Sequence, residues 1–258
     1  VALSGLGGDE LFGGYPSFAR VRRARLLTML PEPIRRTLAG IVSRATSSVP
    51  RAAKAGNLLD AISPLDVYRL SRQLFGQSDI QAFGLACGAD VSSRLPAVPA
   101  DADPFLAISL YELGHYMANT LLRDTDCMSM AHALEVRVPF VDRDVVRTVL
   151  AIPSLYKMNG RPKGLLLDAL GDMLPTEVWQ RPKQGFGLPF DCWMRSALRA
   201  EIDGVLSDRD RIAHIGLEPG CVRQLWNVFL RHPRWVGWSR LWALYVLAKW
   251  CELQRTTL

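Results

Sequence analysis

The stretch Val1–Tyr15, V-A-L-S-G-L-G-G-D-E-L-F-G-G-Y, decides how the rest of the chain is interpreted. Its three apolar residues, Val1 to Leu3, are typical of the end of a buried strand, and a loop rich in glycine follows them directly. Glycines at the carboxyl end of a strand let backbone N–H groups approach an anion, because no Cβ stands in the way. In open α/β sheets that edge is where ligands bind. The stretch therefore predicts a strand followed by an anion-binding loop, although an ordinary glycine-rich turn would have the same composition.

Two acidic residues, Asp9 and Glu10, come directly after these glycines. Carboxylates are the hard oxygen donors that hold Mg²⁺ beside phosphate groups. Asp9 could equally cap the helix that follows the loop, and this second role is compatible with metal binding. The sequence therefore indicates Asp9 as a candidate metal ligand with a structural alternative.

The composition is that of a globular protein. The 258 residues are 49% hydrophobic and 22% charged, which excludes a disordered chain. No apolar run approaches the roughly 18 to 20 residues that a membrane span needs, so we expect no membrane segment. The five cysteines are scattered without metal-ligand spacing, which favours free, mostly buried thiols in the reducing cytoplasm.

The net charge of +6 is concentrated in one segment. Residues 16–57 contain nine Lys or Arg residues and a single acid, Glu32. Such a segment could bind RNA or a membrane surface. Because it lacks aromatic residues interleaved with the basic ones, a solvated surface is the favoured interpretation, and nucleic acid is not an expected partner.

Apolar periodicity predicts a mostly helical chain with almost no strand beyond Val1 to Leu3. The expected helices cover residues 18–30, 34–42, 66–74, 105–122, 126–134, 142–150, 163–174, 189–206, 218–230 and 235–253. The last two hold five of the seven tryptophans, which we expect in the core. Residues 136–140 are expected to form a turn. Residues 43–58 and 91–103 are expected to be loops, the second being the favoured internal boundary.

Three motifs together resemble the asparagine synthetase family. The pattern S-G-x-G-G-D-E-L-F-G-G-Y is similar to the second nucleotide-site motif of its synthetase domain. S-M-A-H-A-L-E-V-R-V-P-F-V-D at Ser129–Asp142 and R-P-K-Q-G-F-G-L-P at Arg181–Pro189 follow in the family's order. Any one of these motifs alone would be a weak signal, but the ordered set is specific.

The resemblance implies an α/β fold, the adenine nucleotide α-hydrolase-like synthetase domain. Residues 1–258 would form the C-terminal part of that domain, mostly helical with one residual strand at the N-terminus. The family's glutaminase domain and its S-G-G-x-D-S pyrophosphate loop do not occur in the sequence. We therefore expect a piece of a longer enzyme that is inactive alone.

The resemblance also implies a reaction. Family members activate the side-chain carboxylate of aspartate with ATP, release pyrophosphate, and let ammonia from glutamine displace AMP from the β-aspartyl-AMP intermediate. ATP and Mg²⁺ are the implied cofactors, and aspartate, ATP and ammonia the implied partners. We expect a cytoplasmic enzyme and include a homodimer among the expectations.

The family's functional residues carry over onto matching positions. The implied ATP-binding residues are Ser4, Gly5, Leu6, Gly7 and Lys163, the implied metal ligand is Asp9, and the implied catalytic residues are Lys183, Glu135 and Asp126. Lys183 would place a point charge on the departing pyrophosphate, with Arg181 as a lesser candidate. Without the motif Lys183 would be read as a solvent-exposed lysine. Glu135 could instead form a buried or half-buried ion pair with Arg137 that anchors the turn at Pro139.

One position departs from the family pattern. The third residue of the loop is usually Glu and is here Leu6, which can neither move a proton nor accept a hydrogen bond. Relatives that act elsewhere stay open as alternatives: exopolysaccharide-linked amidotransferases, β-lactam-forming synthetases and lasso-peptide cyclases. A non-catalytic helical module is a further alternative.

Overall fold

The computed structural model describes residues 1–28, 31–34, 37–38, 63–86, 95–99, 101–158, 160–181 and 187–254. The chain forms two compact units. The first comprises Val1–Ala39, Asn57–Ser71 and Asp90–Lys183, and the second comprises Gly40–Gly56, Arg72–Ala89 and Gln184–Leu258. The opening glycine loop therefore belongs to the first unit. Among the described residues, no helix combines the length and the apolar content that crossing a membrane needs.

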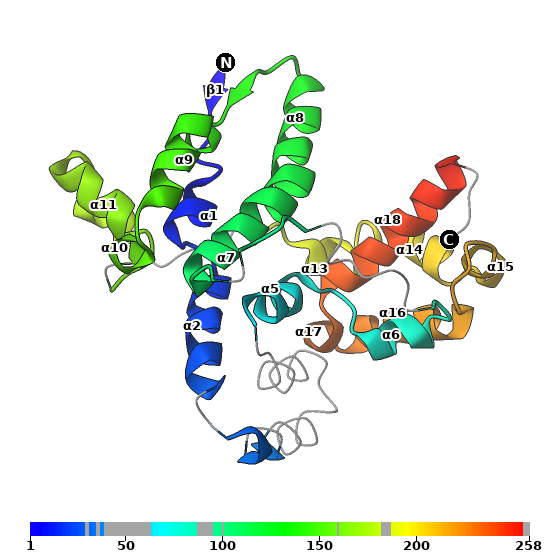
Figure 1. Cartoon of the computed structure of the whole chain (residues 1–258). Helices are drawn as coiled ribbons and strands as arrows, with labels where there is room; N and C mark the ends of the chain where they lie inside the picture. The colour runs from blue at the N-terminus through cyan, green and yellow to red at the C-terminus, as the bar shows by residue number, and fades with distance from the viewer. Residues whose placement is uncertain are drawn as a thin grey trace. The chain divides into compact units, whose positions relative to one another are not determined.

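The described part of the chain is mostly helical, as predicted, and contains one short sheet, in the first unit (Figure 1). Strand β1 (Ala2–Leu3) pairs in parallel with β2 (Val136–Arg137). The predicted N-terminal strand is confirmed, but its predicted burial is wrong, because Val1 is 78% and Leu3 76% exposed. The turn predicted for residues 136–140 is wrong at its start, since the first two residues form β2. Pairing with a distant strand leaves no local periodicity in so short a segment.

Helices and helical turns make up most of the described part of the first unit, and the sheet lies at one end of it (Figure 1). They are α1 (Gly8–Phe12), α2 (Pro16–Thr28), α5 (Pro64–Arg72), α7 (Pro104–Tyr111), the π-helix η2 (Glu112–Leu121), α8 (Leu122–Met130), the 3₁₀ turn η3 (Pro139–Val141), α9 (Arg143–Ala151), α10 (Ser154–Met158), α11 (Gly164–Leu170), the 3₁₀ turn η4 (Gly171–Met173) and α12 (Thr176–Trp179). Helices α7, η2 and α8 form one continuous element, so the two separate helices predicted for 105–122 and 126–134 are wrong.

Side-chain caps begin several of the described helices, α7 and α9 among them. The carboxylate of Asp142 accepts the amide of Asp144 at 2.8 Å, which confirms the predicted cap of α9. Asp103 caps α7 in the same way, through the amides of Phe105 and Leu106. A carboxylate at a helix N-terminus also offsets the positive end of the helix dipole.

Two apolar clusters hold the first unit together. One joins α2, α5 and α7 around Phe18, Tyr68 and Ile108. The other packs Leu11 and Phe12 of α1 against Val149 of α9. Leu11 is fully buried, so α1 and the glycine loop that precedes it are fixed relative to α9.

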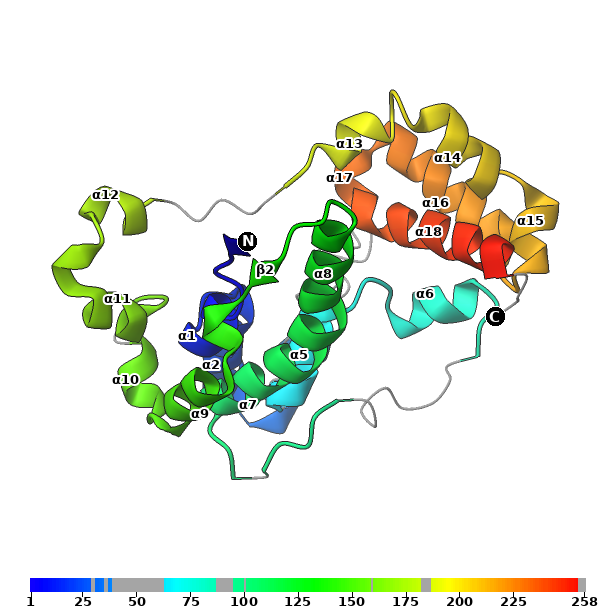
Figure 2. The same ribbon diagram turned by 90° about the horizontal axis from the view of Figure 1, so that it is seen from above.

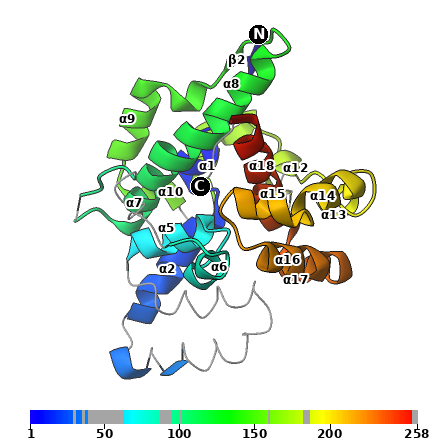
Figure 3. The same ribbon diagram turned by 90° about the vertical axis from the view of Figure 1, so that its right-hand side faces the viewer.

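The second unit is all helical in the part of it that the structure describes. Its helices are α6 (Gln77–Ala82), α13 (Phe190–Trp193), α14 (Arg199–Leu206), α15 (Arg209–His214), α16 (Pro219–Arg231), α17 (Pro233–Val236) and α18 (Trp238–Gln254). Helices α14, α16 and α18 lie side by side (Figure 2), and α16 leads directly into α17 (Figure 3). The single helices predicted for 189–206 and 235–253 are each two helices. Gly237, at φ 80°, makes the second break.

Several burial predictions need correction. Trp226 is fully buried as expected, but Trp235 and Trp250 are 46% and 51% exposed. The four cysteines that the structure describes are not mostly buried, since Cys127 and Cys192 are exposed and only Cys251 is fully buried. The helix predicted for 34–42 lies largely, and the loop predicted for 43–58 wholly, outside the described residues.

Candidate functional site

The glycine loop leaves β1 at Ser4 and enters α1 at Gly8. The Ser4 amide donates to the carbonyl of Arg137 at 2.9 Å, which continues the β1–β2 pairing by one residue. The Ser4 hydroxyl accepts the amide of Leu6 at 3.4 Å. Gly5 is exposed, and a Cβ built on it would meet nothing within 4 Å. The loop therefore has open space above Gly5, where a backbone N–H can approach a ligand.

Position 7 requires a glycine for two reasons, its backbone conformation and the close contacts around it. Its φ is +97°, which L side chains rarely adopt. A Cβ would lie 2.8 Å from Val141 Cγ2 and 2.9 Å from Phe140 Cβ. The loop is thus pressed directly onto η3, which follows β2 in the chain. This contact joins the first and second sequence motifs in space.

The centre of the site is an ion pair between Asp9 of α1 and Lys163, the residue before α11. Lys163 Nζ lies 2.8 Å from Asp9 Oδ1, with side-chain exposures of 38% and 24%. The same ammonium group is 4.0 Å from the position that a Cβ on Gly8 would occupy. The ammonium therefore stands over the start of α1, next to the glycine loop. Of the implied site residues that the structure describes, it brings Asp9 and Lys163 together most closely.

The backbone conformation of Lys163 also holds this residue in place. Lys163 has a left-handed conformation, φ 58°, which is uncommon for a residue other than glycine. Its amide donates to the carbonyl of Phe12 at 2.9 Å, which attaches the start of α11 to the end of α1. Strained backbone of this kind persists only where the surroundings over-determine it, and it is frequent at functional sites.

Arg161 supports the same turn. Its Nη2 lies 2.6 Å from Asp168 Oδ1 on α11, and its guanidinium stacks over the ring of Trp179, with 4.7 Å from Cζ to the ring centroid. Arg161 therefore links the turn that carries Lys163 to both α11 and α12. A planar guanidinium suits this combined role better than an ammonium group would.

Gly14 is a site residue for which the sequence predicted no role. A Cβ on it would lie 1.9 Å from Asp9 Oδ1 and 2.8 Å from Lys163 Cε. Only a glycine leaves room for the ion pair at this position. The signal in the sequence was the doubled glycine, Gly13-Gly14, at the end of α1.

Glu10 turns out to be structural, although it stands next to Asp9. It is 1% exposed, and its Oε1 accepts the Tyr15 hydroxyl at 2.6 Å. Its backbone carbonyl accepts the hydroxyl of Ser109, which ties α1 to α7. A buried carboxylate with such partners stabilises the unit and leaves Asp9 as the accessible acid of the loop.

Glu135 forms the alternative contact that the sequence left open. Its Oε1 lies 2.7 Å from Nε of Arg137, and the two side chains are 56% and 65% exposed. The hydrogen bond and charge of Glu135 raise the pKa of Arg137 above its usual range. The predicted ion pair is therefore present, but its predicted burial is wrong. Asp126, on α8, is exposed, and in the described part of the chain no contact joins its carboxylate to Asp9, Lys163 or Glu135.

The third motif is described only at its edges. Lys183 lies outside the described residues, so its catalytic role stays a prediction. Arg181, two residues earlier, is exposed and donates from Nε to the carbonyl of Glu177 at 3.1 Å. This bond ties the start of the motif to α12.

We expect Gly14→Ala to disrupt this site much more than it disrupts the fold. The new methyl group would displace the side chains of Asp9 and Lys163, which can move, so the melting temperature should fall by only about 4 to 8 °C or less. The Asp9–Lys163 contact should be lost, and ATP binding measured by calorimetry should weaken. The control is Gly204→Ala on α14, where a Cβ meets open space. There we expect unchanged binding and a stability gain of up to about 1 kcal/mol. Equal losses of ATP binding in both variants would contradict this account.

A glycine loop after a parallel strand, with an acid and a lysine paired beside it, is typical of proteins that bind phosphate groups. Residues 1–252 match the family model of asparagine synthase, and the chain therefore belongs to the asparagine synthase family, whose members are ATP-using ligases. The family that the sequence motifs indicated is thereby confirmed.

Individual relatives agree with this assignment. A putative glutamine-hydrolysing asparagine synthetase of Mycobacterium tuberculosis is 30% identical over 208 residues, which cover 76% of this chain and 31% of the relative. Asparagine synthetase 1 of Bacillus subtilis is 26% identical over 251 residues, which cover 89% of this chain and 39% of the relative. The chain thus spans between three and four tenths of the length of these relatives. No solved structure gives a significant match.

Proposed function

We propose that this chain is the part of an asparagine-forming ligase that holds the phosphates of ATP. The reaction joins ammonia derived from glutamine to the side-chain carboxylate of aspartate, through a β-aspartyl-AMP intermediate. The observation that carries the proposal is the Asp9–Lys163 pair, standing beside a glycine loop with open space above Gly5. We place this reaction in the cytoplasm.

The first bond change is attack by an aspartate carboxylate oxygen on the α-phosphorus of ATP, with departure of pyrophosphate. Negative charge grows on the departing group, and the preplaced ammonium of Lys163 would stabilise it. Asp9 holds that ammonium over the start of α1, so less side-chain entropy is lost when the phosphates bind. The Gly5 amide and the Ser4 hydroxyl would contact the nucleotide, while the Ser4 amide stays bonded to the carbonyl of Arg137. In the second step the ammonia nitrogen attacks the acyl carbon and AMP leaves.

Magnesium fits this site only as an ion shared with the substrate. Among the described residues, no group of three His, Cys, Asp or Glu side chains is placed to hold a metal. Mg²⁺ beside phosphates needs only one or two protein carboxylates, because water and phosphate oxygens complete its six ligands. Asp9 is the residue that would hold it, and the ion would neutralise charge on the phosphates.

The test is ATP–pyrophosphate exchange in the longest natural chain that contains these 258 residues. We expect exchange that depends on Mg²⁺ and aspartate, and Asp9→Asn should reduce it by roughly a hundredfold. Asparagine keeps the shape of the side chain but loses the charge that both the metal and Lys163 need. The melting temperature should change by a few degrees at most, because a part-exposed ion pair contributes about 1 kcal/mol or less. Unchanged exchange with a lowered melting temperature would reduce Asp9 to a structural residue.

Leu6 favours a second candidate, a related synthetase that acts on a different acyl substrate. Leu6 is half-buried in the loop and offers no charge to an acyl substrate. Amidotransferases linked to exopolysaccharides and synthetases that form β-lactams or lasso peptides belong to this class. Exchange that is stimulated by another amino or acyl acid but not by aspartate would select it.

We also propose that the protein forms a homodimer, which analytical sedimentation would test.

A further inference from the structure

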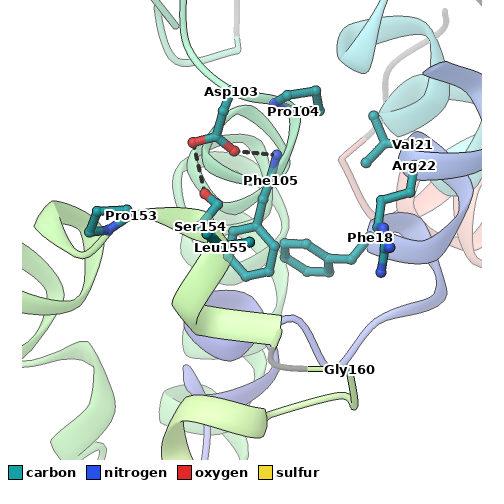
Figure 4. Close-up of a pocket in the computed structure, with 10 residues that line it drawn as sticks. All are labelled: Phe18, Val21, Arg22, Asp103, Pro104, Phe105, Pro153, Ser154, Leu155 and Gly160. Atoms are coloured by element: carbon teal, nitrogen blue, oxygen red, sulfur yellow. Dashed lines mark hydrogen bonds between the residues drawn. The ribbon is translucent and has the colours of Figure 1, made fainter.

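The first unit contains a hollow that none of the proposed ATP-site residues lines. It is a pocket of about 690 Å³ between α2, the start of α7 and the start of α10 (Figure 4). Pockets that hold small molecules typically measure about 300 to 1,000 Å³. The ring of Phe105 lines this pocket and also packs against Gly13 at the end of α1.

The walls of the pocket are mostly apolar. Phe18 and Val21 of α2 are 1% and 3% exposed, and the Phe18 and Phe105 rings pack with their centroids 4.6 Å apart. At the rim, Leu155 is 82% exposed, which leaves a large apolar side chain in water. Covering such a side chain with an apolar ligand is favourable. The pocket is therefore suited to a small apolar body.

Among the described residues that line the pocket, two side chains are charged, and one of them, Asp103, is committed to the fold. The carboxylate of Asp103 accepts the amides of Phe105 and Leu106 and, at 2.7 Å, the hydroxyl of Ser154 (Figure 4). Arg22, in contrast, is exposed and forms no ion pair with any acid of the described chain. The guanidinium of Arg22 is thus free to bind an anion, and a carboxylate matches its planar donors in geometry.

A third charged group lies behind the aromatic wall. Lys157 is fully buried, with its Nζ 5.4 Å from the centroid of the Phe105 ring. Burial lowers the pKa of Lys157 below its usual range, and the nearby charge of Asp103 acts in the opposite direction. When protonated, Lys157 offsets the charge of Asp103, which leaves Arg22 as the uncompensated charge among the described lining residues.

We propose that this pocket binds a small amphiphilic carboxylate. Its apolar body lies against Phe18, Phe105 and Leu155, and its carboxylate binds the guanidinium of Arg22. The proposal does not depend on the ligase activity, because no residue of the ATP site takes part. It assigns a ligand to α2, which is part of the basic segment of residues 16–57 and contributes no residue to the proposed nucleotide site.

The experiment compares three eight-carbon probes by titration calorimetry: octanoate, octan-1-ol and octylammonium. We expect octanoate to bind most tightly and octylammonium most weakly. Arg22→Gln should weaken octanoate binding about tenfold or more, because a hydrogen bond to a charged group is lost, and should change octan-1-ol binding little. The matched control is Arg23→Gln, the next residue on α2 and also exposed, which should leave all three affinities unchanged.

A second variant tests the apolar end of the ligand site. Leu155→Glu replaces an exposed side chain, so the melting temperature should stay the same, while octanoate binding should fall about tenfold or more through like-charge repulsion and lost apolar contact. Equal affinities for octanoate and octan-1-ol would overturn the proposal. So would an Arg23→Gln effect equal to that of Arg22→Gln, or the absence of any octanoate binding. None of these outcomes would affect ATP–pyrophosphate exchange, so the two proposals fail separately.

Discussion

Replacing Lys163 by alanine should lower adenylate formation by about a hundred- to thousandfold in the longest natural chain that contains these residues. The ammonium group is held by Asp9 at 2.8 Å and stands over the start of α1, where the phosphates of ATP are proposed to bind. A preplaced charge acts on the departing pyrophosphate without reorganisation, so its loss is felt mainly in the transition state. Single-turnover formation of acyl-AMP at saturating ATP measures the effect.

Two further variants separate the charge of Lys163 from its packing. Lys163→Met keeps the length of the side chain and should be as slow as Lys163→Ala, whereas Lys163→Arg should recover part of the rate. Lys249→Ala is the control, because Lys249 is a half-exposed lysine in a surface ion pair with Glu252, in the second unit. It should form adenylate at the parental rate. A Lys163→Ala variant within about threefold of the parent, too small a change for a lost transition-state contact, would remove Lys163 from the chemistry.

The backbone around Lys163 predicts that Lys163→Ala lowers the rate of adenylate formation with little loss of stability. The lysine sits at φ 58°, and its turn is linked to α11 and α12 by the contacts of Arg161 with Asp168 and Trp179. An alanine at position 163 keeps the same backbone requirement, so the substitution removes the charge without relaxing the turn. The melting temperature should therefore shift by only a few degrees, which reflects one part-exposed ion pair.

The sequence predicted helix ends correctly where residues next to each other in the chain determine them. The cap of α9 by Asp142 and the start of α16 after Glu218 follow from residue types next to each other in the chain. The break between α17 and α18 was missed, because Gly237 stands inside a continuous apolar pattern and only its positive φ ends the helix. The π-helix η2 was also missed, since its hydrogen-bond pattern is not set by apolar spacing.

In the candidate site, too, only the residues with a local sequence signal were predicted from the residues alone. The glycine loop and Asp9 were indicated by their own sequence, because close approach of a backbone to a ligand needs glycine. Lys163 is far from Asp9 in the chain, so no local pattern could join them, and only the family resemblance indicated that lysine. Burial was the least predictable property. Val1 and Leu3 look like core residues but are exposed, and Glu10 looks like a surface acid but is buried. Which face of a short strand or helix is covered depends on distant segments.

The second large effect is expected at Lys183, in the motif R-P-K-Q-G-F-G that begins at Arg181. The sequence places a proline directly before the lysine, which predicts a restricted backbone there, and a lysine held in this way loses less entropy when it engages a phosphate group. We therefore predict that Lys183→Ala, like Lys163→Ala, lowers adenylate formation by about a hundred- to thousandfold. The melting temperature should stay within a few degrees of the parent.

A variant that lacks both Lys163 and Lys183 tests whether the two lysines act on the same phosphate groups. If Lys163 and Lys183 both act on the phosphates, the double variant should lose less than the product of the two single losses, because groups that act as a unit are not additive. Lys183→Arg should recover part of the rate, since a planar guanidinium does not reproduce a compact point charge. If Lys183→Ala forms adenylate within about threefold of the parent while Lys163→Ala does not, the third motif is structural. The phosphate charge would then be met by the Asp9–Lys163 pair without Lys183.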